Sequence, residues 1–275
     1  MEAGSLSRVL DGVTFAVVDV ETTGLNPAFG HRVCEIAVLR CEGGRELDRF
    51  HRLVNPQRPI SPGAFAVNLI RDEDLIDAPL FSDIVDTVLE MLGDSVLVAH
   101  NAPFDLGFLA SELQMCGLPL PDNLVVDTLA LARQCYSFPS NTLQSVAYYM
   151  HVRPRGEHRA LSDVLTTKRV LQRFLADLAD RGVSTLGDLL EAQWGETEFP
   201  EREIVPLPPH IEEALKTEGR LELRYVSAWG EETRRVVSPL RVTTYGGHLY
   251  LAAFCHLRNE ERTFRLDRIV EMRPE

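Results

Sequence analysis

Two acidic residues stand on alternate positions near the end of one apolar run. Asp19 and Glu21 follow the apolar residues 15–18, and Gly24 ends the run. Because alternate residues of a β-strand face the same side, both carboxylates can address one point in space. Crowded carboxylates repel each other unless a hard cation lies between them, and Mg²⁺ and Mn²⁺ prefer oxygen ligands of this kind. A single pair of this type is more often a strand end with solvated acids, so the interpretation depends on the rest of the chain.

A third acidic residue, Asp105, lies where an apolar run passes into a helix. Residues 96–99 have the pattern of a buried strand, Asn101 is a suitable N-cap, and Pro103 suits the first helical turn. Asp105 then falls in that first turn, at the carboxyl end of a strand, where the ligand sites of α/β sheets gather. His100 is either a packed histidine or part of this site.

A helical pattern much further along the chain begins with His158 and Asp163. Its apolar stripe consists of Leu161, Val164, Leu165, Val170, Leu171 and Phe174. We expect a loop to carry His158, so that its imidazole can move over a metal site, and the helix to fix Asp163. Taken alone, Asp163 could be an ordinary acidic residue at a helix start. Together and in this order, the three groups indicate a catalytic carboxylate site.

These motifs resemble the DEDDh family of 3'-to-5' exonucleases, the DnaQ-like family that includes proofreading exonucleases. The matching motifs are D-V-E-T-T-G-L from Asp19, H-N-A-P-F-D from His100 and H-R-A-L-S-D from His158, with softer matches at residues 67–74 and at Asp127. The resemblance covers residues 13–177, and it implies an RNase H-like fold.

The resemblance also implies roles for individual residues. Two Mg²⁺ or Mn²⁺ ions, about 3.5–4 Å apart in such sites, would be held by four carboxylates: Asp19, Glu21, Asp105 and Asp163. His158 would act as the general base toward the attacking water, a role that suits a side chain titrating near neutral pH. The residues implied to bind the substrate are Thr22, Thr23, Gly24, Leu25, His100, Asn101 and Phe104. The threonine hydroxyls and the loop backbone would meet the 3'-OH, and Leu25 would wedge against the terminal base.

Composition and length set further bounds. At 275 residues the chain is long enough for one large or two modest domains, and 45% hydrophobic and 25% charged residues are ordinary for a soluble globular protein. The first residues lack the basic and apolar regions of a signal peptide, and no apolar run is long enough to cross a bilayer. The five cysteines form no C-x-x-C pair, which indicates reduced cysteines and argues against a disulfide scaffold or a zinc site. We therefore expect a cytoplasmic protein without a membrane partner.

The net charge of −13 at first disfavours a nucleic-acid enzyme, because phosphate binding favours basic surfaces. From Leu207 onward, however, 11 basic and 11 acidic residues balance, so the preceding part, with 17 basic and 30 acidic residues, carries the whole excess. Part of that excess is the metal site itself, whose cations would offset it. The charge distribution suggests an enzyme that grips a short stretch of strand and does not coat long duplexes.

The hydrophobic pattern predicts alternating strands and helices in residues 1–182. Strands are expected at 13–19, 33–41, 46–54, 95–99 and 123–127, and helices at 80–92, 103–117, 128–136, 142–150 and 160–180. Residues 42–44 suit the turn of a hairpin. Mixed strands covered by helices indicate an α/β layer fold, and the family resemblance makes this domain an RNase H-like mixed sheet flanked by helices. A short helix and an acidic, proline-bearing segment at 183–207 are interpreted as a linker.

Residues 208–275 show a different pattern, a short helix at 208–218 followed by β-rich runs. These runs lie at 221–226, 234–242, 248–255 and 262–269, with turns at Gly230 and at Gly246 and Gly247. Four short strands without a connecting helix indicate a small antiparallel barrel or curled sheet. The segment resembles a WYL domain, a small Sm- or SH3-like barrel, although Leu249 replaces the signature tryptophan. The resemblance implies a module that binds single-stranded nucleic acid or a nucleotide regulator.

Three arginines of this segment are candidate phosphate ligands: Arg262, Arg265 and Arg268. The planar guanidinium group suits phosphate, and Tyr245, Tyr250 and Phe254 could offer faces for base stacking. The arginines could equally solubilise an edge strand or pair with Asp267 and Glu271. On the same terms, the aromatic residues could be ordinary half-buried strand residues.

The sequence therefore predicts a metal-dependent 3'-to-5' exonuclease that hydrolyses phosphodiester bonds at the 3' ends of single-stranded nucleic acid, with DNA favoured over RNA. A 3'-to-5' exoribonuclease is one alternative, because a preference for the 2'-OH depends on local shape. A catalytically silent nucleic-acid-binding regulator is another, and the five intact catalytic positions argue against it.

Overall fold

The structure is a computed structural model that describes residues 6–27, 30–153, 159–195, 197, 199, 208–217, 219–227, 231–245 and 248–275. Several predicted features lie outside the described residues: His158, most of the linker, Gly230, Gly246, Gly247 and the side chain of Tyr245. The chain forms two compact units, of which the first contains Met1–Pro27 and His31–Pro200 and the second contains Glu201–Glu275. Each unit is described by itself.

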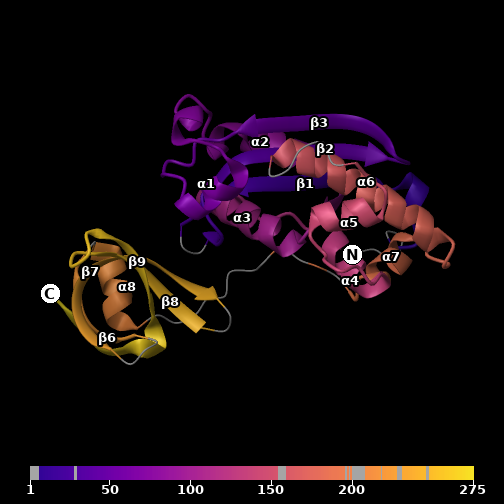
Figure 1. Cartoon of the computed structure of the whole chain (residues 1–275). Helices are drawn as coiled ribbons and strands as arrows, with labels where there is room; N and C mark the ends of the chain where they lie inside the picture. Colours follow the sequence, from indigo (N-terminus) through magenta and orange to yellow (C-terminus); the bar gives the residue numbers. More distant parts are fainter. Residues whose placement is uncertain are drawn as a thin grey trace. The chain divides into compact units, whose positions relative to one another are not determined.

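The first unit is built on a five-stranded mixed sheet (Figure 1). Its strands are β1 (Thr14–Thr22), β2 (Val33–Glu42), β3 (Arg45–Leu53), β4 (Val96–Ala99) and β5 (Val125–Asp127), in the spatial order β3-β2-β1-β4-β5. β2 runs antiparallel to β1 and β3, whereas β4 is parallel to β1 and to β5. The turn between β2 and β3 falls on Gly43 and Gly44, whose φ angles of 51° and 82° suit the predicted hairpin.

Helices cover both faces of this sheet, as the sequence predicts. They are α1 (Pro62–Asn68), α2 (Phe81–Leu92), α3 (Ala102–Met115), α4 (Thr128–Cys135), α5 (Leu143–Tyr149), α6 (Ala160–Ala179) and α7 (Leu186–Ala192). Strand alternation divides β1 between two cores: Phe15 and Val17 pack with α6, whereas Ala16 and Val18 pack with α2 and α3. Asp19 and Glu21 continue the row that faces α6, and this row positions the site.

Two short helices refine the prediction. α1 follows Ser61, whose side chain accepts a hydrogen bond from the backbone N–H of Ala64. Only seven residues long, this helix has too little periodicity to be recognised from the sequence. α7 corresponds to the helix predicted within the linker, yet its buried Leu186 and Leu189 belong to the same core as α6. That helix therefore belongs to the first unit.

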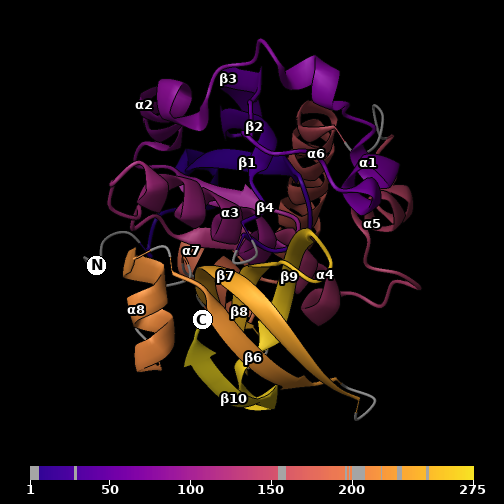
Figure 2. The same cartoon turned by 90° about the vertical axis from the view of Figure 1, so that its left-hand side faces the viewer.

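The second unit is a curved antiparallel sheet with one helix against it (Figures 1 and 2). Its elements are α8 (Pro209–Thr217), β6 (Leu221–Val226), β7 (Glu232–Tyr245), β8 (His248–Cys255), β9 (Glu260–Arg265) and β10 (Ile269–Pro274), and the strand order is β10-β6-β7-β8-β9. The run predicted as one strand at 262–269 is divided by the 3₁₀ turn Leu266–Arg268, so a fifth strand, β10, returns to pair with β6. Among the described residues no pairing joins β9 to β10, and the sheet is curled without being a closed barrel.

Among the residues that the structure describes, no helix is both long enough and apolar enough to span a membrane. The five cysteines are free, and Cys34, Cys41 and Cys255 are buried.

The position of α7 leads to a stability prediction. Leu189→Ala should lower the free energy of unfolding by about 2–5 kcal/mol, because it leaves a cavity in the main core of the first unit. Urea denaturation of the full chain, followed by tryptophan fluorescence and far-UV circular dichroism, measures this loss. Leu47→Ala is the control, since Leu47 is 47% exposed and its truncation should cost no more than about 0.5 kcal/mol. Equal effects of the two changes would contradict the assignment of α7 to this core.

Candidate active site

Three carboxylates meet where β1 approaches the start of α6. Their ligand oxygen atoms, one each from Asp19, Glu21 and Asp163, all lie within 4.8 Å of one another. Asp19 and Glu21 come from alternate positions of β1, and Asp163 comes from the first turn of α6. Asp163 is buried, whereas the two strand residues are partly exposed. The structure thus brings together three of the four predicted metal ligands around one point.

The fourth predicted ligand, Asp105, lies next to this cluster. It is buried in the first turn of α3, and its Oδ1 accepts a hydrogen bond of 3.0 Å from the backbone N–H of Val20, between Asp19 and Glu21. Asn101 occupies the N-cap position of α3 with a φ of 76°, but its side chain makes no capping hydrogen bond. Instead its backbone N–H donates to Asp127 Oδ1 at 2.9 Å. Asp127 thereby fixes the start of the helix that carries Asp105.

The electrostatics of the cluster favour a cation. Burial, reinforced by the neighbouring carboxylates, raises the pKa of Asp19 well above its ordinary value and that of Glu21 to about 7. Burial is also the main cause that raises the pKa of Asp105 to about 8. Carboxyl groups with such raised pKa values hold protons near neutral pH unless a positive charge replaces them. An all-oxygen donor set with this property fits a hard divalent ion.

The loop after β1 carries four of the predicted substrate ligands. Thr22 Oγ1 donates to the carbonyl oxygen of Gly24 at 2.7 Å, and Thr23 Oγ1 accepts from the backbone N–H of Arg32 at 3.0 Å. Both threonines are buried, so their hydroxyls hold the loop, and the predicted contact with a 3'-OH stays a prediction. Leu25 is 87% exposed and is the member of this group that projects from the loop.

His31 and Asn68 complete the loop, and the sequence pattern did not single either out for this role. A Cβ atom at Gly24 would lie 2.3 Å from His31 Cε1, so only glycine leaves room for the imidazole. Asn68 is buried at the end of α1, and its Nδ2 donates to the carbonyl oxygen of Thr22 at 3.3 Å. A hydrogen bond from Asn68 also opposes the rise in the pKa of Glu21, whose main cause is burial.

His100 and Phe104, two further predicted substrate ligands, are both partly exposed, and their contact with a substrate stays a prediction. The two ring nitrogens of His100 lie 2.9 Å from Thr128 Oγ1 and 2.9 Å from the carbonyl oxygen of Asn141, and burial lowers its pKa. The alternative of a packed histidine therefore describes His100 better, and it ties β4 to α4 and to the segment before α5. Phe104 is half-buried with its ring 5.0 Å from that of Phe108.

A further buried acid, Glu35, was not predicted from the sequence. It stands opposite Glu21 in the β1–β2 register and has no exposed surface. Burial alone would raise the pKa of Glu35, but hydrogen bonds from Arg159, His51 and the backbone of Ala160 outweigh it and lower the pKa. Its partners are too distant in sequence for any local pattern to reveal.

In the second unit, the predicted phosphate-binding arginines are partly engaged with carboxylates. Arg262 pairs with Glu260 at 3.1 Å, and Arg265 makes a two-pronged contact of 2.7 and 2.6 Å with Asp267. Arg265 thus pairs with Asp267, one of the two partners that the ion-pair alternative named, whereas the partner of Arg262 is Glu260, which that alternative did not name. Arg268 lies in the 3₁₀ turn that follows β9.

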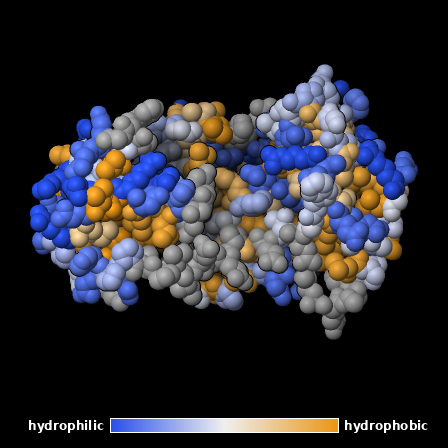
Figure 3. All heavy atoms as spheres, turned by 90° about the horizontal axis from the view of Figure 1, so that it is seen from below, coloured by the Kyte–Doolittle hydropathy of each residue, from blue (hydrophilic) through white to orange (hydrophobic). Residues whose placement is uncertain are grey.

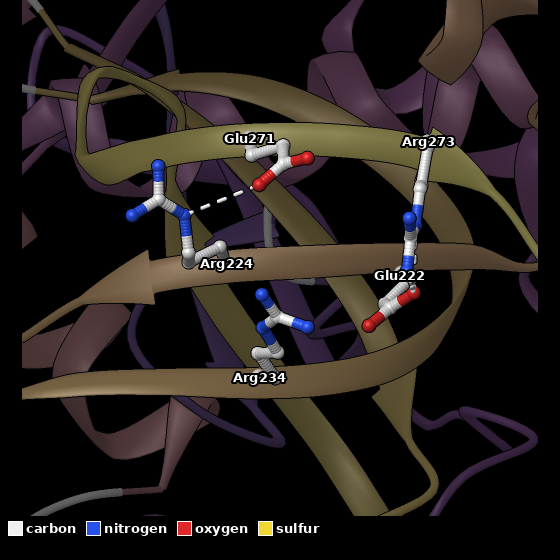
Figure 4. A pocket seen from close by; sticks show the side chains of 5 residues that line it. All are labelled: Glu222, Arg224, Arg234, Glu271 and Arg273. Carbon is white, nitrogen blue, oxygen red and sulfur yellow. Dashed lines mark hydrogen bonds and ion pairs between the residues drawn. The ribbon is translucent and has the colours of Figure 1, made fainter.

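Another charged cluster lies across β10, β6 and β7 (Figure 4). It consists of Glu222, Arg224, Arg234, Glu271 and Arg273. Arg224 Nε lies 3.3 Å from Glu271, and Arg273 Nε donates to Glu222 at 2.8 Å. Arg234 is exposed, and no hydrogen bond or ion pair joins its side chain to a residue that the structure describes. Figure 3 shows that hydrophilic residues stand beside hydrophobic ones on this unit, at the left of the view from below.

Comparisons with known proteins agree with this geometry. The family described as Exonuclease matches residues 16–171, and the WYL domain matches residues 207–274. Over 186 residues the chain is 35% identical to the DNA polymerase III PolC-type of Bacillus subtilis (strain 168), a match that covers 67% of this chain and 13% of that protein. The chain thus spans only a small part of that polymerase.

Two solved structures share the fold of the first unit. Exonuclease X in complex with 5' overhanging duplex DNA is 26% identical with a TM-score of 0.50, and the match covers 65% of this chain and 99% of that one. The nuclease domain of 3'hExo, described as a DEDDh family member bound to rAMP, is 21% identical with a TM-score of 0.53, covering 60% of this chain and 92% of that one.

The fold is that of the RNase H-like exonucleases, and the carboxylate cluster is a group of residues that could hold a metal ion. The chain belongs to the exonuclease family, and residues 207–274, after the nuclease unit, match the WYL domain. The family predicted from the three motifs is confirmed.

The raised pKa values give a prediction about pH and metal. Because Glu21 and Asp105 have folded-state pKa values of about 7 and 8, the metal-free folded protein binds protons that the unfolded chain releases above about pH 4–5. Their contribution therefore lowers stability as pH rises from 5 to 8. Mg²⁺ or Mn²⁺ replaces those protons, so it should raise the melting temperature more at pH 8 than at pH 6.

Differential scanning fluorimetry of the chelated and metal-loaded protein across this pH range checks that expectation. Asp105→Asn should flatten the pH dependence and reduce the metal-induced shift. Asp177→Asn is the control, because Asp177 pairs with Arg181 far along α6 from the cluster. A metal-induced shift that is equal at both pH values would contradict the raised pKa values.

Proposed function

We propose that the protein is a metal-dependent 3'-to-5' exonuclease that hydrolyses phosphodiester bonds at the 3' ends of single-stranded nucleic acid, with DNA favoured. The observation that carries this proposal is the meeting of Asp19, Glu21 and Asp163 within 4.8 Å, with Asp105 bound to the strand between two of them. Without a cation, these carboxyl groups must either hold protons near neutral pH or bear the repulsion among their charges, so the cluster favours binding of a cation.

The four carboxylates would hold two Mg²⁺ or Mn²⁺ ions. Bound there, the ions would favour ionisation of a water and offset the charge that develops on the scissile phosphate. The backbone positions these side chains: β1 sets the spacing between Asp19 and Glu21, and the first turn of α6 holds Asp163 beside them. Leu25, exposed beside the site, would pack against the terminal base.

His158 is the proposed general base that removes a proton from the attacking water. It lies outside the described residues, five positions before Asp163, so the sequence spacing and the family motif support this role. An unperturbed histidine titrates near neutral pH and can accept the proton at physiological pH.

A 3'-to-5' exoribonuclease is the second candidate. One structural neighbour is described with duplex DNA and another with rAMP, so both sugars occur among proteins of this fold. Labelled single- and double-stranded DNA and RNA, compared at equal Mg²⁺ or Mn²⁺, would decide between the two. A silent regulator would cleave none of them.

Substitutions should separate metal binding from proton transfer. Asp19→Ala should abolish cleavage and weaken metal binding, because it removes a ligand from the three-oxygen cluster. His158→Ala should lower turnover on the order of 10²–10⁴-fold with metal affinity nearly unchanged, because its imidazole handles a proton and holds no ion. Single-turnover cleavage and calorimetric metal titration measure the two effects. Full activity of wild type in excess chelator would refute the metal-dependent mechanism, and near wild-type turnover of His158→Ala would refute the base.

The WYL unit is proposed to bind nucleic acid that feeds the site, or a nucleotide that regulates it. Support comes from the balanced charge after Leu207, in contrast to the acidic part before it. Arg234 is exposed without an ion-pair partner among the described residues, whereas Arg262 and Arg265 would have to exchange a carboxylate for phosphate.

Truncation after Pro206 should therefore keep metal-dependent cleavage of short oligonucleotides but weaken binding or processivity on long strands. Arg262→Ala with Arg265→Ala should reproduce part of the loss, and Arg234→Ala should do so alone. Each lost phosphate contact should reduce the slope of log affinity against log salt by about one unit. Fluorescence anisotropy at several salt concentrations measures this. If the truncated and full-length proteins bind and degrade long strands equally well, the WYL unit does not bind the substrate strand.

A further inference from the structure

Glu35 is a fully buried carboxylate beside the catalytic cluster, and its hydrogen bonds come entirely from the protein. Oε1 accepts from His51 Nε2 at 2.7 Å and from Arg159 Nη2 at 2.8 Å. Oε2 accepts from Arg159 Nε at 3.0 Å and from the backbone N–H of Ala160 at 3.1 Å. Both oxygens are therefore engaged, and Glu35 is absent from the three-oxygen cluster found among the described residues. It differs in this respect from Glu21, which stands opposite it in the sheet.

The donors to Glu35 come from two elements that must be held together. His51 belongs to β3, while Arg159 and Ala160 form the N-cap and first residue of α6. The side chain of Arg159 does not cap the helix. The first N–H groups of a helix have no partner within it, and a negative charge is favourable at that end. Glu35, on the neighbouring strand, supplies both a hydrogen-bond acceptor for the N–H of Ala160 and a negative charge at this helix end. It therefore takes the place of an N-cap side chain.

The helix end that Glu35 holds is the one that carries the chemistry. Asp163 follows Ala160 by three residues, or about 4.5 Å along the helix axis. His158 immediately precedes Arg159 in the sequence. A shift of the helix start would therefore move Asp163, a proposed metal ligand. Displacement of a group at a reacting centre by about 1 Å can cost on the order of 10²-fold in rate.

We propose that Glu35 is a positioning residue of the exonuclease: held by His51, it fixes the start of α6 and so sets Asp163 against Asp19 and Glu21. This inference rests on the proposed function, because it concerns the rate of that reaction. Glu35 touches neither ion nor substrate. Its loss should lower kcat and leave KM for the oligonucleotide nearly unchanged, since the Leu25 loop is held by other contacts.

Glu35→Gln tests the proposal with little change in shape. The amide keeps one acceptor oxygen and loses the negative charge that pairs with Arg159. Its NH₂ group must face either His51 and Arg159 Nη2 or Arg159 Nε and Ala160, so one of these two sets of donors loses its acceptor. We expect kcat to fall on the order of 10- to 100-fold with KM within about threefold of wild type. Steady-state cleavage of a labelled single strand at saturating Mn²⁺, with circular dichroism and melting temperature recorded for each protein, provides the measurement.

Glu112→Gln is the matched control. Glu112 is equally buried, accepts a two-pronged contact from Arg32 at 2.8 and 2.7 Å, and accepts from the backbone N–H of Val33 at 3.1 Å. It joins α3 to β2 and has no contact with α6 among its recorded partners. This change should lower the melting temperature comparably but keep kcat within about threefold of wild type.

Two further substitutions keep the test decisive if Glu35→Gln does not fold. His51→Leu removes the hydrogen bond from His51 to Glu35 but leaves the ion pair of Glu35 with Arg159, and it should lower kcat several-fold. His51→Gln keeps a hydrogen-bond donor at this position, so its kcat should be close to that of wild type. The proposal is overturned if Glu35→Gln, or in its absence His51→Leu, keeps wild-type kcat, or if Glu112→Gln loses as much kcat as Glu35→Gln. An inactive wild-type protein would instead refute the proposed function.

Discussion

Repulsion among crowded carboxylates is the interaction on which the rest of this structure depends. Asp19, Glu21 and Asp163 converge within 4.8 Å, and the pKa values of Asp19 and Glu21 are raised by burial and by their acidic neighbours. Side chains free to move would relieve this repulsion by separating. Each side chain is instead carried by a strand or helix that packs against a core, so the carboxylates stay close together. This arrangement lowers the stability of the metal-free protein but keeps the site formed for a cation.

The carboxylates at this end of the sheet are of two physical kinds. Glu35 has a lowered pKa because protein donors satisfy both of its oxygens, so it is a stable anion without any ion. Glu21, directly opposite in the sheet, has a raised pKa and lacks such a set of donors. Sequence gives no basis for telling these two glutamates apart. The direction of the pKa shift tells them apart: the lowered pKa of Glu35 belongs to an acid that stabilises the fold, and the raised pKa of Glu21 belongs to an acid that is available to a metal.

Features that depend on local order were predictable. The period of two on β1 placed Asp19 and Glu21 together, and the strand-to-helix transition placed Asp105. Features that depend on distant pairing were not. Glu35 and Arg159 are 124 residues apart, and β10 pairs with β6 across the whole second unit. His100 shows a third case, since its motif is that of the family while its two ring nitrogens are used inside the protein.

The charge of the nuclease unit follows from the same constraint. Four ligand carboxylates carry a formal charge that two divalent ions can cancel, whereas Glu35 is already balanced by Arg159. Without metal, the site would repel the phosphates of a strand as well as its own side chains. Metal binding would thus remove this repulsion, and the ions themselves would present positive charge to the phosphates next to them. An acidic nuclease unit is then compatible with a nucleic-acid substrate, because the attraction is needed only at the few phosphates next to the ions and is supplied there by the metal.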